Sequence, residues 1–123
     1  MSKYGNKKTW VDDLQFDSIK EARYYIYLRE RQKRGEISGL RLQVSYEILP
    51  AVYEDRVVKL KTKEKIERHK VQPAVHYIAD FVYVEDGKEV VVDVKSAATK
   101  KKDSYILKKK MMRALLGITI IEV

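Results

Sequence analysis

The stretch HYIADFVYVEDGKEVVVDVK (residues 76–95) decides the fold that the sequence predicts. Two runs rich in β-branched and aromatic residues flank Asp86-Gly87, and Asp-Gly between such runs is the strongest short-range indication of a β-hairpin. A two-residue turn at this point places Asp80 directly opposite Asp93 on the neighbouring strand. The hairpin therefore predicts two carboxylates side by side on one face of a sheet.

These two carboxylates would repel each other. Directly opposite side chains have Cβ atoms about 5 Å apart, where two like charges cost roughly 3 kcal/mol at an effective dielectric of about 20. A cation between the two groups, or a proton on one of them, removes this repulsion. Lys95 follows Asp93 by two residues and so lies on the same face. Asp80, Asp93 and Lys95 together indicate a divalent-metal site with a catalytic cation beside it.

Length and composition bound the class of protein. The 123 residues fit a single domain over 1–123, and the hydrophobic share of 45% favours a globular fold. No apolar run approaches the roughly 20 residues of a membrane span, and the polar N-terminus is expected to be a flexible arm over residues 1–13. The chain has no cysteine and two histidines, so a metal would be held by carboxylates, which suit Mg²⁺ or Mn²⁺.

The charge indicates a polyanionic partner. The net charge is +8 and the isoelectric point is about 9.5. Basic residues concentrate in 56–70 and in 100–113, and the second segment carries seven of them against one acid. The seven are Lys100, Lys101, Lys102, Lys108, Lys109, Lys110 and Arg113. They are expected to bind DNA, although a solvated helix face would show the same pattern.

The remaining elements follow from caps and periodicity. Ser18 and Glu21 have the spacing of a capping box at the start of a helix predicted over 18–34. The alternating residues 40–49 predict a strand, on whose polar face Gln43 is expected to be solvated rather than to line the site. Further along the chain we expect a strand continuing over 52–60, an exposed excursion at 61–70, a polar link at 96–103, a helix at 104–116 and a strand at 118–123.

This pattern resembles that of the PD-(D/E)xK nuclease superfamily. The resemblance rests on Glu21 in a first helix, Asp80 on a middle strand and Asp93-Val94-Lys95 on the next strand. It implies an α/β fold with a restriction-endonuclease-like αβββαβ core, in which helices flank a mixed sheet. From about Lys3 to the C-terminus the chain is also similar to a small phage and prophage family of this superfamily. The chain departs from the superfamily pattern at Ala79, where proline is usual, and at Asp93, where glutamate is commoner.

The resemblance implies a metal-dependent DNA endonuclease. Asp80, Asp93 and the Val94 carbonyl would hold Mg²⁺ or Mn²⁺, Glu21 would bind it directly or through water, and Lys95 would act on the attacking water or the phosphate. The expected partner is double-stranded or branched DNA in the cytoplasm of a bacterial host, and the resemblance is compatible with a homodimer.

Two rival functions remain open on the sequence. One is a non-catalytic nucleic-acid-binding protein that retains a nuclease-like fold, and the other is a basic RNA-binding protein whose tyrosines stack on bases. Glu21 has an alternative as well, because a capping-box acid needs no role beyond the helix N-terminus.

Overall fold

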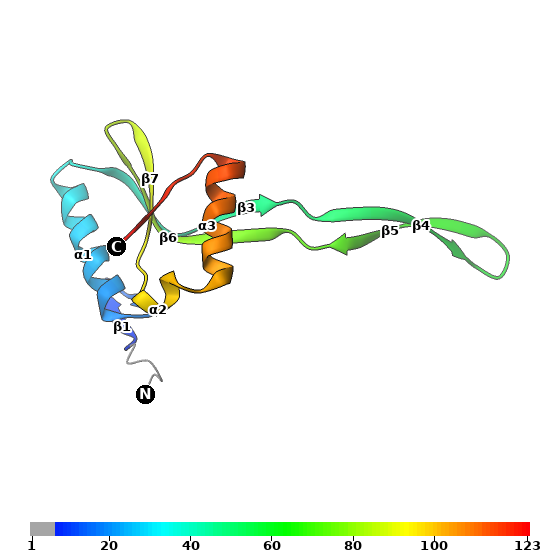
Figure 1. The fold of residues 1–123 in the computed structure, drawn as a ribbon, viewed down its shortest axis with the longest axis horizontal. Helices are drawn as coiled ribbons and strands as arrows, with labels where there is room; N and C mark the ends of the chain where they lie inside the picture. Colours follow the sequence, from blue (N-terminus) through cyan, green and yellow to red (C-terminus); the bar gives the residue numbers. More distant parts are fainter. Residues whose placement is uncertain (1–6) are drawn as a thin grey trace.

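The computed structural model describes residues 7–123 and shows an α/β protein with a mixed central sheet (Figure 1). The sheet has the order β3 (Ser38–Leu49), β6 (Val75–Glu85), β7 (Lys88–Asp93) and β8 (Ile120–Glu122). Neighbouring strands are antiparallel except β7 and β8, which are parallel. The sheet is therefore mixed, as the sequence predicts.

The predicted hairpin is confirmed in both position and register. β6 and β7 pair Glu85 with Lys88 and Phe81 with Val92. The turn between them has φ of 52° at Asp86 and 74° at Gly87. A type I′ turn requires positive φ at both central residues, which is why Asp-Gly is so strong a predictor of it.

Three helices lie among the described residues. α1 (Ile19–Lys33) begins after Ser18, whose hydroxyl accepts a hydrogen bond from the Glu21 amide at 3.1 Å, as expected for the cap. α3 (Asp103–Leu116) agrees with the predicted helix and ends at Gly117. The short α2 (Ala97–Lys100) lies in the segment expected to be a polar link. None of the helices in residues 7–123 is long and apolar enough to cross a membrane.

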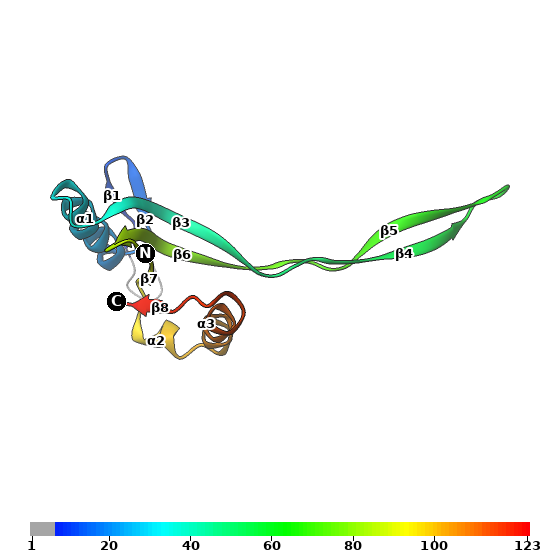
Figure 2. The ribbon, with the colours of Figure 1, turned by 90° about the horizontal axis from the view of Figure 1, so that it is seen from above.

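The helices cover opposite faces of the sheet (Figure 2). One hydrophobic cluster joins α1 to the sheet and contains Phe16, Ala22, Tyr25, Leu28, Ile37, Phe81, Tyr83 and Val92. The other joins α3 to the opposite face and contains Ile48, Tyr77, Ala79, Val82, Val91, Tyr105, Met112 and Ile120. Because β6 and β7 contribute to both clusters, the predicted hairpin forms the middle layer of a three-layer body.

The N-terminal segment is more ordered than the sequence indicates. β1 (Thr9–Val11) lies within residues 1–13, which were expected to be a flexible arm, and it pairs with β2 (Leu14–Phe16) in a small antiparallel hairpin. Residues 1–6 of that stretch lie outside the described range. Phe16 is buried in the α1 cluster, and Asp12 accepts hydrogen bonds from Tyr25 at 3.0 Å and Arg29 at 2.8 Å. These contacts hold the hairpin on α1.

A long two-stranded arm projects from the body (Figure 1). It consists of β4 (Val52–Lys59) and β5 (Glu64–Gln72), which pair antiparallel in a sheet of their own. The expected continuation of a strand to about residue 60 is confirmed. The lysine- and glutamate-rich segment 61–70 is exposed and projects from the body, as expected, and most of it forms the returning strand β5. The strand was not predicted, because a strand with solvent on both faces need not alternate in sequence.

A pair of substitutions on α3 tests the packing of this layer. Met112 is fully buried against the sheet, whereas Leu107 on the same helix is 58% exposed. We expect Met112→Ala to lower the free energy of unfolding by about 2–5 kcal/mol and Leu107→Ala to change it by less than about 1 kcal/mol. Urea titration followed by circular dichroism measures both. Equal losses would show that α3 does not pack as described.

Candidate active site

Asp80 and Asp93 are held together by reciprocal hydrogen bonds at the end of the β6–β7 ladder. The Asp80 amide donates to Asp93 Oδ1 at 2.8 Å, and the Val94 amide donates to Asp80 Oδ2 at 3.0 Å. The two acids are thus cross-strand neighbours, at the position that the register predicts. Each carboxylate accepts a backbone N–H from the other strand, which partly offsets the repulsion expected from two adjacent negative charges.

Asp93 is the most constrained acid of the site. Its side chain is fully buried, and Oδ2 has no hydrogen-bond partner among the described residues. Burial raises the pKa of the Asp93 carboxyl to about 6, although the hydrogen bond from the Asp80 amide and the charge of Lys95 oppose the shift. A buried carboxylate oxygen without a donor is costly, and a proton or a cation would satisfy it.

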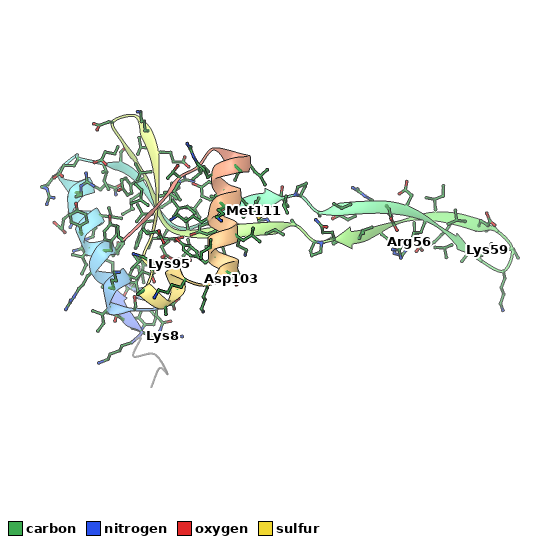
Figure 3. All side chains as sticks on the ribbon, viewed as in Figure 1. Lys8, Arg56, Lys59, Lys95, Asp103 and Met111 are labelled. Atoms are coloured by element: carbon green, nitrogen blue, oxygen red, sulfur yellow. The ribbon has the colours of Figure 1, made fainter. Side chains whose placement is uncertain are left out.

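Lys95 provides the nearest positive charge (Figure 3). Its Nζ lies 4.0 Å from Asp93 Oδ2 and 5.3 Å from the centre of the Tyr105 ring. The Tyr105 hydroxyl donates to Glu122 Oε2 at 2.9 Å, and its pKa is raised by burial and by that hydrogen bond. The Lys95 ammonium therefore lies near both the Asp93 carboxylate and the Tyr105 ring, which the hydrogen bond to Glu122 holds in place.

Glu21 approaches this centre from α1, but not as a compact third ligand. Its carboxylate is buried, and burial, followed by the charges of Asp80 and Asp17, raises the pKa of Glu21 to about 7. Gln43 connects the acids, since its Nε2 donates to Asp80 Oδ1 at 3.2 Å and to Glu21 Oε1 at 3.4 Å. Glu21 is therefore both the acid after the N-cap and part of the site, so the two alternatives are compatible.

Gln43 has a strained backbone at the point where the β3–β6 ribbon changes its packing partner. Leu42 and Phe81 pack in the α1 cluster, whereas Val44 and Ala79 pack in the α3 cluster. Gln43 lies between them with φ of 51°, a value that costs a non-glycine residue about 1–3 kcal/mol. Gln43 is exposed, as the sequence predicts, and its side-chain amide also contacts Asp80 and Glu21. Nothing in the sequence marks its backbone conformation.

The residues fit a hard divalent cation bound by few protein ligands. A cleft of about 220 Å³ is lined by Asp17, Ser18, Lys20, Glu21, Asp80, Val94, Lys95, Ser96 and Thr99, and the buried Asp93 adjoins it. No group of three acids or histidines in residues 7–123 forms a compact metal cage. Mg²⁺ is often held by one or two carboxylates together with water, so Asp80 and Asp93 suit it. Direct binding by Glu21 or the Val94 carbonyl stays a prediction.

The structure places six of the seven basic residues of 100–113 along two different clefts, and Lys101 borders neither of them. Lys102 and Lys108 border a cleft of about 330 Å³ that also includes Lys95. Across α3, a cleft of about 450 Å³ is bordered by Lys100, Lys109, Lys110 and Arg113. In this second group the Lys109 ammonium is bound to Glu122 at 2.5 Å. The lysines 108–110 therefore do not form one continuous phosphate-binding surface.

Comparison with known proteins places the chain in a family without assigning a function. The family model described as "Protein of unknown function (DUF1064)" matches residues 1–116, so the chain belongs to this family. No curated protein and no solved structure matches the chain.

The burial of Asp93 predicts how stability depends on pH in the absence of metal. Because the folded-state pKa of about 6 exceeds the ordinary 3.8, the protonated form is favoured in the fold, and its stabilisation is lost as pH rises through 6. We expect Asp93→Asn to match the wild type near pH 4 and to exceed it by up to about 3 kcal/mol at pH 7. Urea unfolding in EDTA measures the difference. Parallel curves for the two proteins would contradict the assignment.

Proposed function

We propose that this protein is a metal-dependent DNA endonuclease with a core of the PD-(D/E)xK type. The observation that carries the proposal is the buried Asp93 Oδ2, which accepts no hydrogen bond from the described part of the chain, adjoins Asp80 and lies 4.0 Å from Lys95 Nζ. Two acids and a lysine at the ends of neighbouring strands are the pattern on which the resemblance rests. The order α1, β3, β6, β7, α3, β8 supports the same core.

Each site residue has a role in phosphodiester hydrolysis. Asp80 and Asp93 would hold Mg²⁺, which when bound activates water and offsets negative charge on the phosphate in the transition state. Lys95 would donate a hydrogen bond from Nζ to a phosphate oxygen or to the attacking water, and Tyr105 would keep the ammonium in place. Glu21, whose pKa is raised to about 7, would accept a proton on its carboxylate near neutral pH.

Gln43 would position two of these acids. Its side-chain amide donates to both Glu21 and Asp80, so it links an acid of α1 to an acid of β6. Its strained backbone supports such a role, because strained residues concentrate at functional sites.

The charge favours a nucleic acid as substrate, and the resemblance implies that it is DNA. Lys102 and Lys108 border the cleft that contains Lys95, so phosphates next to the scissile bond would meet cations there. The net charge of +8 adds attraction that does not depend on base sequence. A branched or recombination substrate is the finer form of the proposal, and it derives from the resemblance to phage proteins.

A cleavage assay distinguishes this proposal from its rivals. Linear, nicked, flapped and four-way DNA and a single-stranded RNA are incubated with Mg²⁺, with Mn²⁺ or with EDTA. The proposal expects DNA cleavage that requires the metal. Tight DNA binding without cleavage under any condition would favour the non-catalytic protein, and a preference for RNA in binding would favour the RNA-binding protein.

Substitution of the site residues separates metal binding from phosphate chemistry. We expect Asp93→Asn to abolish cleavage and to reduce the stabilisation that Mg²⁺ gives the wild type, because one ligand loses its charge. Lys95→Ala should retain DNA affinity and the Mg²⁺ shift while losing cleavage, since its contact is made in the transition state. Thermal unfolding with and without Mg²⁺ and single-turnover cleavage provide the readouts. Equal Mg²⁺ shifts in wild type and Asp93→Asn would remove the metal site, and full cleavage by Lys95→Ala would remove Lys95 from the mechanism.

The two groups of basic residues should contribute unequally to DNA binding. We expect the double variant Lys102→Gln/Lys108→Gln to weaken DNA binding. The slope of log affinity against log salt concentration should become shallower by up to about 1.8, or about 0.9 for each lost phosphate contact. The charge-matched control Lys110→Gln/Arg113→Gln changes the other side of α3 and should have the smaller effect. Salt-titrated binding in EDTA measures both. A larger effect of the control would place the DNA on the opposite side of α3.

A further inference from the structure

The β4–β5 arm has no evident role in folding. Its strands pair only with each other in their sheet, and the two hydrophobic clusters of the described residues are built from body elements. An isolated two-stranded hairpin is marginally stable in water at best. Such a long projection needs another reason to be present, and that reason lies on its surface.

The surface of the arm is cationic, most strongly at its tip. Residues 51–72 carry seven basic side chains against four acidic ones. Two of the acids are engaged locally, Glu54 by Arg56 at 3.0 Å and Glu67 by Lys65 at 2.9 Å. The tip, residues 59–63, contains three lysines and no acid. Figure 3 shows Lys59 near the far end of the arm.

One face of the arm combines cations with an aromatic ring and exposed apolar side chains. The Cζ atom of Arg68 lies 4.0 Å from the centre of the Tyr53 ring, and the Nζ atom of Lys70 lies 5.8 Å from it. Val57 and Ile66 form a cross-strand pair with exposed fractions of 63% and 71%. A ribbon with this face can lie along a nucleic-acid groove, because the major groove of B-DNA, about 12 Å wide, admits a two-stranded β-ribbon.

We propose that the arm binds a second segment of duplex DNA, remote from the segment at the Asp80–Asp93 cleft. The inference deepens the proposed function and rests on it for the position of the first segment. Polyanionic DNA is the occupant that the charge favours. A second copy of the chain would instead bring the cationic tip against a molecule of net charge +8.

The length of the arm sets the size of the substrate. An extended strand rises about 3.3 Å per residue, so Lys63 lies up to about 55 Å from Asp80 along β5 and β6. At about 3.4 Å per base pair this distance corresponds to about 16 base pairs. The protein therefore recognises either a duplex longer than this or a branched DNA in which another duplex lies beside the arm.

Binding measured without cleavage tests the arm independently of the endonuclease. The tip variant Lys59→Gln/Lys61→Gln/Lys63→Gln is compared with wild type in EDTA on 12-base-pair and 40-base-pair duplexes and on a four-way junction. The charge-matched control is Lys33→Gln/Arg34→Gln/Lys88→Gln. These three exposed cations lie at the C-terminal end of α1 and at the start of β7, at the end of the body opposite the arm (Figure 1).

For the 40-base-pair duplex or the junction, we expect the tip variant to make the slope of log affinity against log salt concentration shallower by up to about 2.7. Its affinity for the 12-base-pair duplex should be unchanged. The control should lose no more on long than on short DNA. Equal losses by the tip variant on all substrates, or equal losses by tip and control, would overturn the proposal. Because cleavage is not measured, this result stands even if no endonuclease activity is found.

A shortened chain gives a second test. Replacing residues 51–73 by Asn-Gly joins β3 to β6 through a tight turn and should keep the circular dichroism spectrum and the thermal transition of the body. This variant should bind 12-base-pair DNA like wild type and lose the additional affinity for 40 base pairs. Light scattering gives the molar mass of both proteins. A dimer that becomes a monomer without the arm, with unchanged preference for long DNA, would show that the arm binds a second copy instead.

Discussion

Two hydrogen bonds, from the Asp80 amide to Asp93 and from the Val94 amide to Asp80, are the constraint on which this structure depends. They continue the connection between β6 and β7 beyond the last backbone pair and keep both acids inside a three-layer body. They use one carboxylate oxygen of Asp93, and the other is buried with no donor among residues 7–123. The fold therefore accepts an unfavourable group at its centre, as natural proteins do at functional sites.

A strained backbone residue, Gln43, lies beside this pair of acids. The β3–β6 ribbon has to contribute to the α1 cluster at one end and to the α3 cluster at the other, and the change occurs at the Gln43–Asp80 position. Gln43 takes up this change through its positive φ and at the same time directs its amide toward Asp80 and Glu21. The position at which the packing of the ribbon changes is thus also where the Gln43 side chain contacts Glu21 of α1.

The sequence predicted the features that depend on local chemistry. Asp86-Gly87 specified both the turn and the register, and through the register it placed Asp80 beside Asp93. Ser18 specified the start of α1. These predictions succeeded because a turn type and a helix cap each require particular residues within a few positions.

Two kinds of feature were not predictable in this way: those that depend on contacts with distant parts of the chain, and strands that pack against nothing. The φ value of Gln43 follows from two layers competing for one ribbon, and no residue near it indicates this. The returning strand β5 is solvated on both faces, so its sequence carries no alternation to identify it. The small hairpin β1–β2 is stabilised by Phe16 and Asp12 acting on α1, which lies further along the chain.

The electrostatics of the site connect these features to DNA binding. The cleft brings together Asp17, Glu21, Asp80 and the adjoining Asp93, which without metal repel a phosphate. Lys20 and Lys95 line the same cleft, and Lys109 of α3 is already bound to Glu122. In the proposed function, the cations of the arm and the lysines around α3 would therefore supply further attraction for DNA. It also follows that a divalent ion at Asp80 and Asp93 reverses the local repulsion, so metal and DNA should each strengthen the binding of the other, by the same factor.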